Sequence, residues 1–159
     1  MTELLETGAG GFDEDKTAYC LPESIGSMVH LTDICVQNNY LKGELPTTLS
    51  KCKRLQILRL EINQITGTIP SQFGQLGNLR VLFLVDNNIH GAIPEALSQC
   101  KQLEYLWLTN NNMSGKVPER LASLRHLQCI SLEGNNFAEL QETEVYLKEK
   151  LGDQLQVLI

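Results

Sequence analysis

The chain has 159 residues, of which 42% are hydrophobic and 20% are charged, and its formal net charge is −6 at pH 7. A chain of this length buries enough apolar surface for one soluble domain. It contains no run of about 18 consecutive apolar residues, so we expect no membrane span. The acidic balance also argues against nucleic-acid binding.

The N-terminal segment, residues 1–20, is acidic and rich in glycine. We expect an irregular lead-in, in which Phe12 takes the place of a strand residue. The segment has neither a basic start nor an apolar stretch, so it is unlike a secretory signal. The sequence therefore predicts a cytoplasmic protein, provided that Met1 is the natural start.

Residues 21–140 repeat one pattern with a period of 24 residues. Four near-complete units cover residues 31–46, 55–70, 79–94 and 103–118. A fifth unit begins at Leu127 and loses its ending, and residues 21–31 supply the back half of an earlier, degraded unit. A fixed period of this size predicts a stacked solenoid.

Each unit is predicted to contribute one short strand, because apolar residues two positions apart, such as Leu58 and Leu60, alternate as on a strand with one buried face. The asparagine that follows, here Asn63, would leave a buried amide at the end of the strand. We expect it to bond to backbone groups of adjacent turns, so that these asparagines form a ladder. Gly67 and Pro70 are predicted to turn the chain at the end of the unit.

The units end in LKGELP, ITGTIP, IHGAIP and MSGKVP. Together with the preceding LxxLxLxxN segments, these endings resemble the LxGxIP pattern of the plant-type leucine-rich repeat family. The resemblance implies an α/β solenoid, a right-handed coil with a parallel β-sheet on its concave side and short helical turns on its convex side. It also implies a role in binding proteins or peptides.

Residues 141–159 depart from the repeat. Leu147, Leu151, Leu155 and Leu158 recur at helical spacing and predict an amphipathic helix, although Gly152 weakens that prediction. A terminal repeat otherwise exposes its apolar core, so we expect this helix to cap the solenoid. A helix that docks a partner or lies on a membrane surface is the weaker alternative, because the charges of the segment are mixed.

The five cysteines form neither a metal-binding motif nor a paired disulfide frame. Cys52 and Cys100 stand where other units have a larger apolar residue, so we predict that both are small core residues. Extracellular proteins of the plant-type class usually carry paired-cysteine caps at their ends. Such caps are missing here, which argues against a receptor ectodomain.

Residues between the buried strand positions face outward on the predicted sheet. In the three middle units they form three columns, namely Ile57, Val81 and Tyr105; Arg59, Phe83 and Trp107; and Glu61, Val85 and Thr109. Neighbouring strands about 4.8 Å apart bring these side chains into contact, and Trp, Tyr and Arg are enriched at binding hot spots. We predict that these nine residues bind a protein or peptide partner. The alternative is that the aromatic residues only stabilise the sheet by cross-strand packing.

A second surface feature is a basic stripe on the convex side, formed by Lys53, Lys101 and Arg125. The stripe would suit an acidic partner, although such a stripe is more often a solvated face.

No residues are spaced for catalysis. The three histidines occupy different parts of the repeat, and the glycines are too far apart to form a phosphate-binding loop. We therefore expect no cofactor, no metal and no enzymatic activity, and we predict an interaction module that is monomeric by itself. The alternatives are a structural or regulatory subunit of a permanent assembly, an extracellular receptor-like or inhibitor domain and, as a formal rival, an enzyme.

Overall fold

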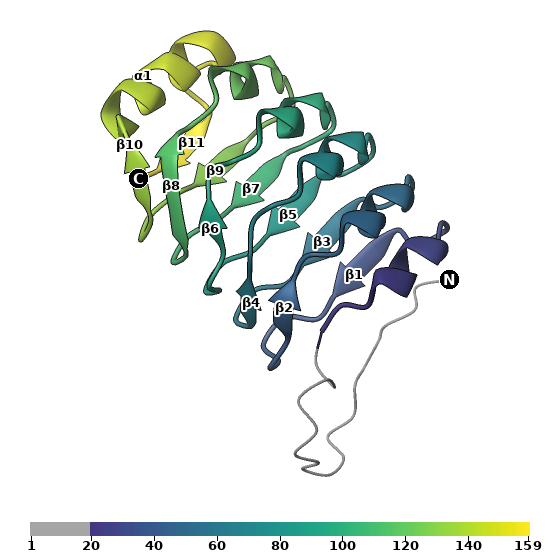
Figure 1. Ribbon diagram of the computed structural model, residues 1–159. Coiled ribbons are helices and arrows are strands. Elements are labelled where there is room, and N and C mark those ends of the chain that lie inside the picture. The colour runs from purple at the N-terminus through teal and green to yellow at the C-terminus, as the bar shows by residue number, and fades with distance from the viewer. Residues whose placement is uncertain (1–19) are drawn as a thin grey trace.

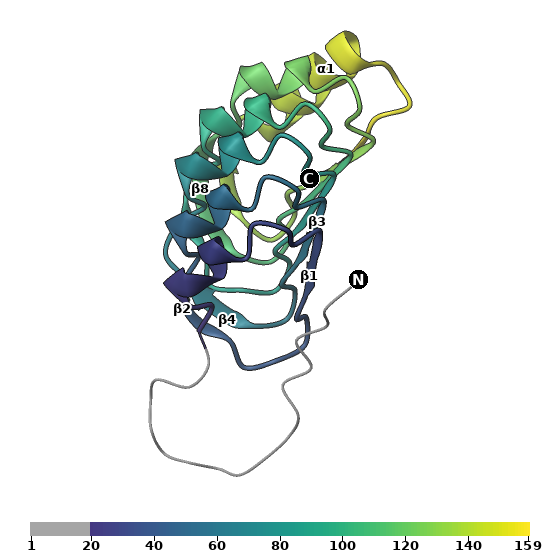
Figure 2. The same ribbon diagram turned by 90° about the vertical axis from the view of Figure 1, so that its right-hand side faces the viewer.

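The computed structural model of the protein describes residues 20–159. The predicted lead-in, including Phe12, therefore lies outside the described residues, apart from Cys20. In the described part, each repeat makes one turn of a solenoid (Figure 1). Strands β1 and β3 lie on one side of the coil and the short helices lie on the other (Figure 2). This arrangement confirms the predicted fold class.

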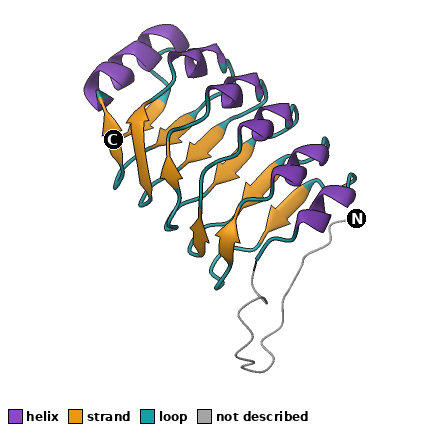
Figure 3. Cartoon of the chain, viewed as in Figure 1, coloured by secondary structure: helices purple, strands orange, loops and turns teal. Residues whose placement is uncertain are grey.

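The concave side carries one parallel sheet (Figure 3). Within residues 20–159, its six strands follow the order β1 (Asp33–Cys35), β3 (Ile57–Arg59), β5 (Val81–Phe83), β7 (Tyr105–Trp107), β9 (Cys129–Ser131) and β11 (Gln156–Leu158). From β1 to β9 the register follows the repeat, since Ile57 pairs with Val81 and Val81 pairs with Tyr105. The columns predicted from the repeat period are therefore columns of neighbouring residues on this sheet.

Five 3-10 helices lie on the convex side of the described residues, namely η1 (Glu23–Ser27), η2 (Thr47–Lys51), η3 (Ser71–Gln75), η4 (Glu95–Gln99) and η5 (Glu119–Ser123). The repeat prolines, such as Pro70 before η3, come directly before these helices. Short strands form two further parallel sheets at the corner after the asparagine, which we did not predict. These strands are β2 (Lys42–Glu44), β4 (Gln64–Thr66), β6 (His90–Gly91), β8 (Asn112–Lys116) and β10 (Asn136–Ala138).

The predicted asparagine ladder is present. The Oδ1 atom of Asn87 accepts a hydrogen bond from the Ile65 amide at 3.0 Å, and its Nδ2 atom donates to the carbonyl oxygens of Leu60 and Leu84 at 2.9 and 3.1 Å. Because Leu60 and Ile65 belong to the preceding turn, one buried amide joins two turns. The same bonds recur at Asn63, Asn111 and Asn135.

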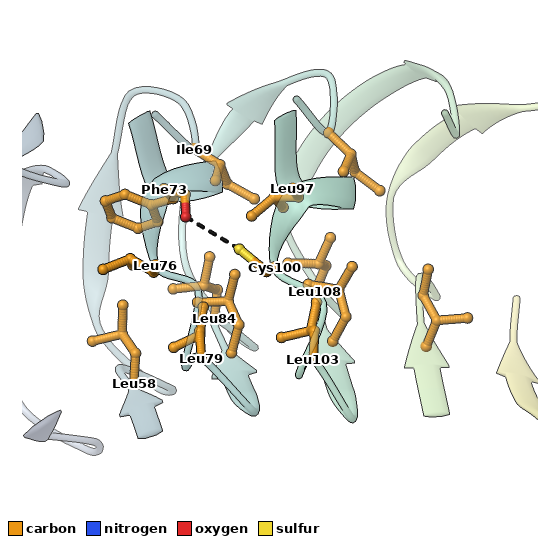
Figure 4. Packing of buried hydrophobic residues seen from close by; sticks show 14 of the residues in the cluster. Leu58, Ile69, Phe73, Leu76, Leu79, Leu84, Leu97, Cys100, Leu103 and Leu108 are labelled. Atoms are coloured by element: carbon orange, nitrogen blue, oxygen red, sulfur yellow. Dashed lines mark hydrogen bonds between the residues drawn. The ribbon is translucent and has the colours of Figure 1, made fainter. Parts of the chain in front are cut away.

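The core is a continuous column of mainly aliphatic side chains, to which η3 contributes Phe73 (Figure 4). Cys52 and Cys100 are fully buried, as predicted. The Cys100 thiol donates to the carbonyl oxygen of Phe73 at 3.2 Å. Burial raises the pKa of the Cys100 thiol to about 11, so it stays protonated at neutral pH and serves as a small core residue.

The turns are stacked so closely that Gly74 has no room for a side chain. A Cβ atom on Gly74 would lie 2.3 Å from the carbonyl oxygen of Ala96 in the next turn. We expect Gly74→Ala to lower the free energy of unfolding by about 1–3 kcal/mol, because the backbone must shift. Urea denaturation followed by circular dichroism measures this loss.

Gly77→Ala is the matched control, because a Cβ atom there meets nothing within 4 Å. We expect this variant to be as stable as the wild type or slightly more stable. Equal urea midpoints for the two variants would contradict the close stacking at Gly74.

The C-terminal segment differs from the helix predicted over residues 141–159. Helix α1 (Leu140–Leu151) is shorter, and it ends at Gly152, whose φ is +100°. The chain then adds strand β11 to the concave sheet. Leu155, just before this strand, and Val157 within it are both buried, with the alternation of a strand. Helix α1 packs against η5 and buries Leu147, so the helix and the strand together cover the last repeat.

Candidate functional site

The candidate site is a patch on the concave sheet, which we call the concave patch. It consists of the nine predicted residues Ile57, Arg59, Glu61, Val81, Phe83, Val85, Tyr105, Trp107 and Thr109. The structure brings all nine together, on three neighbouring strands and the residues that follow them. Their side chains are half-buried, which leaves part of each open to contact.

The middle of the concave patch is a stack of three side chains. Phe83 and Trp107 lie on adjacent strands, and their rings are parallel within 8°, with centroids 4.1 Å apart. The guanidinium carbon of Arg59 lies 5.6 Å from the centroid of the Phe83 ring, on the preceding strand. Stacked rings and a cation over a ring face both add to the burial energy, so the stack forms one rigid, partly apolar surface.

Glu61 fixes the position of the arginine. Its Oε1 atom lies 3.0 Å from both Nε and Nη2 of Arg59. The Arg59 side chain is 41% exposed, whereas that of Glu61 is only 12% exposed. The ion pair therefore holds the guanidinium against the Phe83 ring and leaves the cation accessible at the edge of the stack.

Two polar atoms of the concave patch have no partner. Within the described residues, Glu61 Oε2 and Trp107 Nε1 are buried without a hydrogen bond. An unpaired buried polar atom lowers stability by about 1–3 kcal/mol. Local features that cost stability are typical of sites kept for function.

The columns on either side of the stack each form a hydrogen bond to the next turn. The Tyr105 hydroxyl donates to Gln128 Oε1 at 2.7 Å, which orients the ring. The Thr109 hydroxyl bonds to that of Ser131 in the next turn. These bonds fix the polar ends of the concave patch, so its shape is set before any partner arrives.

Sequence reasoning missed one neighbour of the concave patch. Strand β11 pairs Leu158 with Ser131, and Ser131 pairs with Trp107. Leu158 therefore extends the column that contains Arg59, Phe83 and Trp107. The Leu158 side chain is 43% exposed, whereas Ser131 is buried. The signal was the alternation of Leu155 and Val157, which fits a strand as well as the helix that we predicted.

The basic stripe has a structural explanation. Lys53 Nζ donates to Gln75 Oε1 at 2.9 Å, and Lys101 Nζ donates to Ser123 Oγ at 2.8 Å. In the same way, Arg125 Nη1 donates to the carbonyl oxygen of Lys150 at 3.0 Å. Each cation thus bridges to a segment stacked on its own turn.

The described residues offer no arrangement for metal binding. Among residues 20–159, no group of three or more His, Cys, Asp or Glu side chains is placed to hold a metal ion. In the same part of the chain, no helix has both the length and the apolar character that crossing a bilayer requires.

The protein is a repeat solenoid, and the side chains of its concave patch are held in place by stacking and hydrogen bonds. Residues 29–89 and 78–137 each match the sequence model of the leucine-rich repeat. The chain therefore belongs to the leucine-rich repeat family, and its repeats are of the plant type. No curated protein sequence matches the chain significantly.

Several similar solved structures are plant receptors. The ectodomain of the Arabidopsis thaliana membrane receptor kinase GASSHO1/SCHENGEN3, in complex with CASPARIAN STRIP INTEGRITY FACTOR 2, is 36% identical with a TM-score of 0.72, over 74% of this chain and 14% of that one. The plant peptide hormone receptor RGFR1, in complex with RGF2, is 27% identical with a TM-score of 0.68, over 74% and 23%. The ectodomain of the Arabidopsis receptor kinase SOBIR1 is 31% identical with a TM-score of 0.71, over 77% and 67%. The chain thus spans less than a quarter of the first two receptor chains.

Proposed function

We propose that this protein is a non-catalytic interaction module that binds a protein or peptide on the concave patch. The observation that carries the proposal is the half-buried stack of Phe83 and Trp107, held at one end by Arg59. Large rigid aromatic side chains and arginine supply most of the energy at many protein interfaces. The receptor structures in complex with RGF2 and CASPARIAN STRIP INTEGRITY FACTOR 2 support binding by this fold.

The chemistry of the concave patch suits a partner with an apolar anchor. Phe83 and Trp107 form the flat centre, and Val81 and Val85 widen it on the middle strand and just beyond it. Polar groups lie mainly at the edges, where Arg59 and Glu61 neutralise one another. An apolar centre with a polar rim is the usual anatomy of a specific interface.

Affinity purification from cell extract tests the proposal. The wild type is compared with the double variant Phe83→Ala/Trp107→Ala, and retained proteins are identified by mass spectrometry. We expect at least one protein to be retained by the wild type and lost from the double variant. The Lys53→Ala/Lys101→Ala variant is the control, because it removes two cations of the convex side and should keep that partner.

An unchanged set of retained proteins in the aromatic variant would contradict the proposal, provided that circular dichroism shows all variants to be folded. In that case the aromatic side chains only stabilise the sheet by cross-strand packing.

The remaining features of the proposal are expectations. We infer that the chain is monomeric by itself and does not bind nucleic acid, which is in keeping with its net charge of −6. The cytoplasmic location stays a prediction. The similar structures named above include receptor ectodomains, so they give that location no support.

A further inference from the structure

A cleft lies between α1 and the last complete repeat, away from the concave patch. Its volume is about 780 Å³, and its walls come from η4, the end of β8, η5 and the first two turns of α1. Figure 1 shows α1 and β10 beside β8, where these segments meet. The volume falls within the range of about 300–1,000 Å³ that is usual for ligand-binding clefts.

The floor of the cleft is apolar. Ile93, Val117 and Leu147 line it, and all three are buried, with exposed fractions of 2%, 6% and 1%. Tyr146 of α1 adds a half-buried aromatic ring to the wall. Such a floor suits an aliphatic side chain of a partner.

The rim of the cleft carries an excess of negative charge. Lys116 Nζ lies 2.7 Å from Glu139 Oε1, and Arg120 Nε lies 2.7 Å from Glu95 Oε1, so both cations of the lining are already paired.

Two further carboxylates of the lining, those of Glu119 and Glu142, form no ion pair with any described residue. They are close enough to act on Lys116, whose pKa is raised first by its hydrogen bond to Glu139 and further by the charges of Glu139, Glu119 and Glu142. The free charge at the rim is therefore negative.

We propose that this cleft is a second binding site, which takes a peptide segment with an arginine or lysine next to an aliphatic residue. The cation lies between the carboxylates of Glu119 and Glu142, and the aliphatic side chain covers Val117 and Leu147. An acidic segment is disfavoured, because it would have to displace Glu95 and Glu139 from their cations. This site is independent of the concave patch, so either site can fail without the other.

Fluorescence anisotropy of a labelled peptide with the sequence Gly-Leu-Arg-Arg-Leu-Gly tests the proposal on the full chain. We expect saturable binding that weakens with added salt, because exposed charge pairs are screened. In the double variant Glu119→Gln/Glu142→Gln, the dissociation constant should rise roughly tenfold, since two charge contacts are lost. The matched peptide Gly-Leu-Glu-Glu-Leu-Gly should bind more weakly than the arginine peptide.

Glu133→Gln is the control variant, because Glu133 is an exposed carboxylate that follows the concave strand β9 instead of lining the cleft. It should leave the dissociation constant unchanged. Amide chemical shifts of isotope-labelled protein should move around Val117 and Tyr146 when the arginine peptide is added. The proposal is overturned by absence of binding, by equal losses in the two variants, by tighter binding of the glutamate peptide, or by shifts confined to the concave sheet.

Discussion

Trp107→Ala is expected to weaken binding of a concave-patch partner by roughly 30-fold, which corresponds to about 2 kcal/mol. Trp107 lies between Phe83 on one neighbouring strand and Ser131 on the other. Its removal takes away the largest contact surface and also leaves the Phe83 ring without its stacking partner. Isothermal titration calorimetry with the partner captured by affinity purification measures the loss.

The stack also predicts that its two rings act together. Because Phe83 and Trp107 are in contact, their alanine variants should not be additive, and a double-mutant cycle should give a coupling energy above about 0.5 kcal/mol. Tyr40→Ala is the matched aromatic control, since Tyr40 is 71% exposed and lies outside the concave patch. A similar loss of affinity for Tyr40→Ala and Trp107→Ala would rule out a specific role for the stack.

Asn87→Ala is expected to lower the free energy of unfolding by about 3 kcal/mol or more, the largest stability loss that we predict. The substitution leaves the buried amide of Ile65 without its partner, and it removes one of the two side-chain hydrogen bonds to the carbonyl oxygen of Leu60, which keeps the bond from Asn63. An unsatisfied buried group costs about 1–3 kcal/mol, and a lost hydrogen bond costs about 0.5–1.5 kcal/mol more. Because both groups belong to the preceding turn, the loss weakens the interface between two turns, on which the stability of a solenoid depends.

Asn39→Ala is the control for this prediction. Asn39 has the same place in its repeat, but its amide is exposed and, among residues 20–159, bonds only to the nearby carbonyl oxygens of Val36 and Gln37. We expect a loss of less than about 1 kcal/mol, because water replaces these bonds. Urea denaturation curves of both variants test the difference, and equal losses would show that the bond between turns contributes little.

The comparison of Asn39 with Asn87 illustrates how far the sequence could be interpreted. The repeat period placed both residues in one column, and the structure confirms the column and its ladder. Within the part of the chain that the structure describes, of these two side chains only that of Asn87 joins two turns, and the period did not distinguish the two residues. Asn39 is also exposed, whereas Asn87 lies in a middle repeat and is buried.

The residues of the candidate site were also predictable from the repeat period. A parallel sheet whose register advances by one repeat brings Arg59, Phe83 and Trp107 side by side, whatever the details of packing. The sequence did not reveal the parallel stacking of the two rings, the ion pair of Arg59 with Glu61 or the addition of Leu158. These features depend on side-chain conformations and on a segment outside the repeat.

The sequence by itself determined the solenoid, the buried column and the residues that share the concave face, because one local pattern repeated at a fixed period admits one way of stacking. Only the tertiary structure decided how the solenoid ends, with α1 shortened at Gly152 and β11 joined to the sheet. It alone revealed the cleft between α1 and η5. The physical reason is that the end of a solenoid has no following repeat, so its structure is set by contacts between unlike segments, which no periodic pattern records.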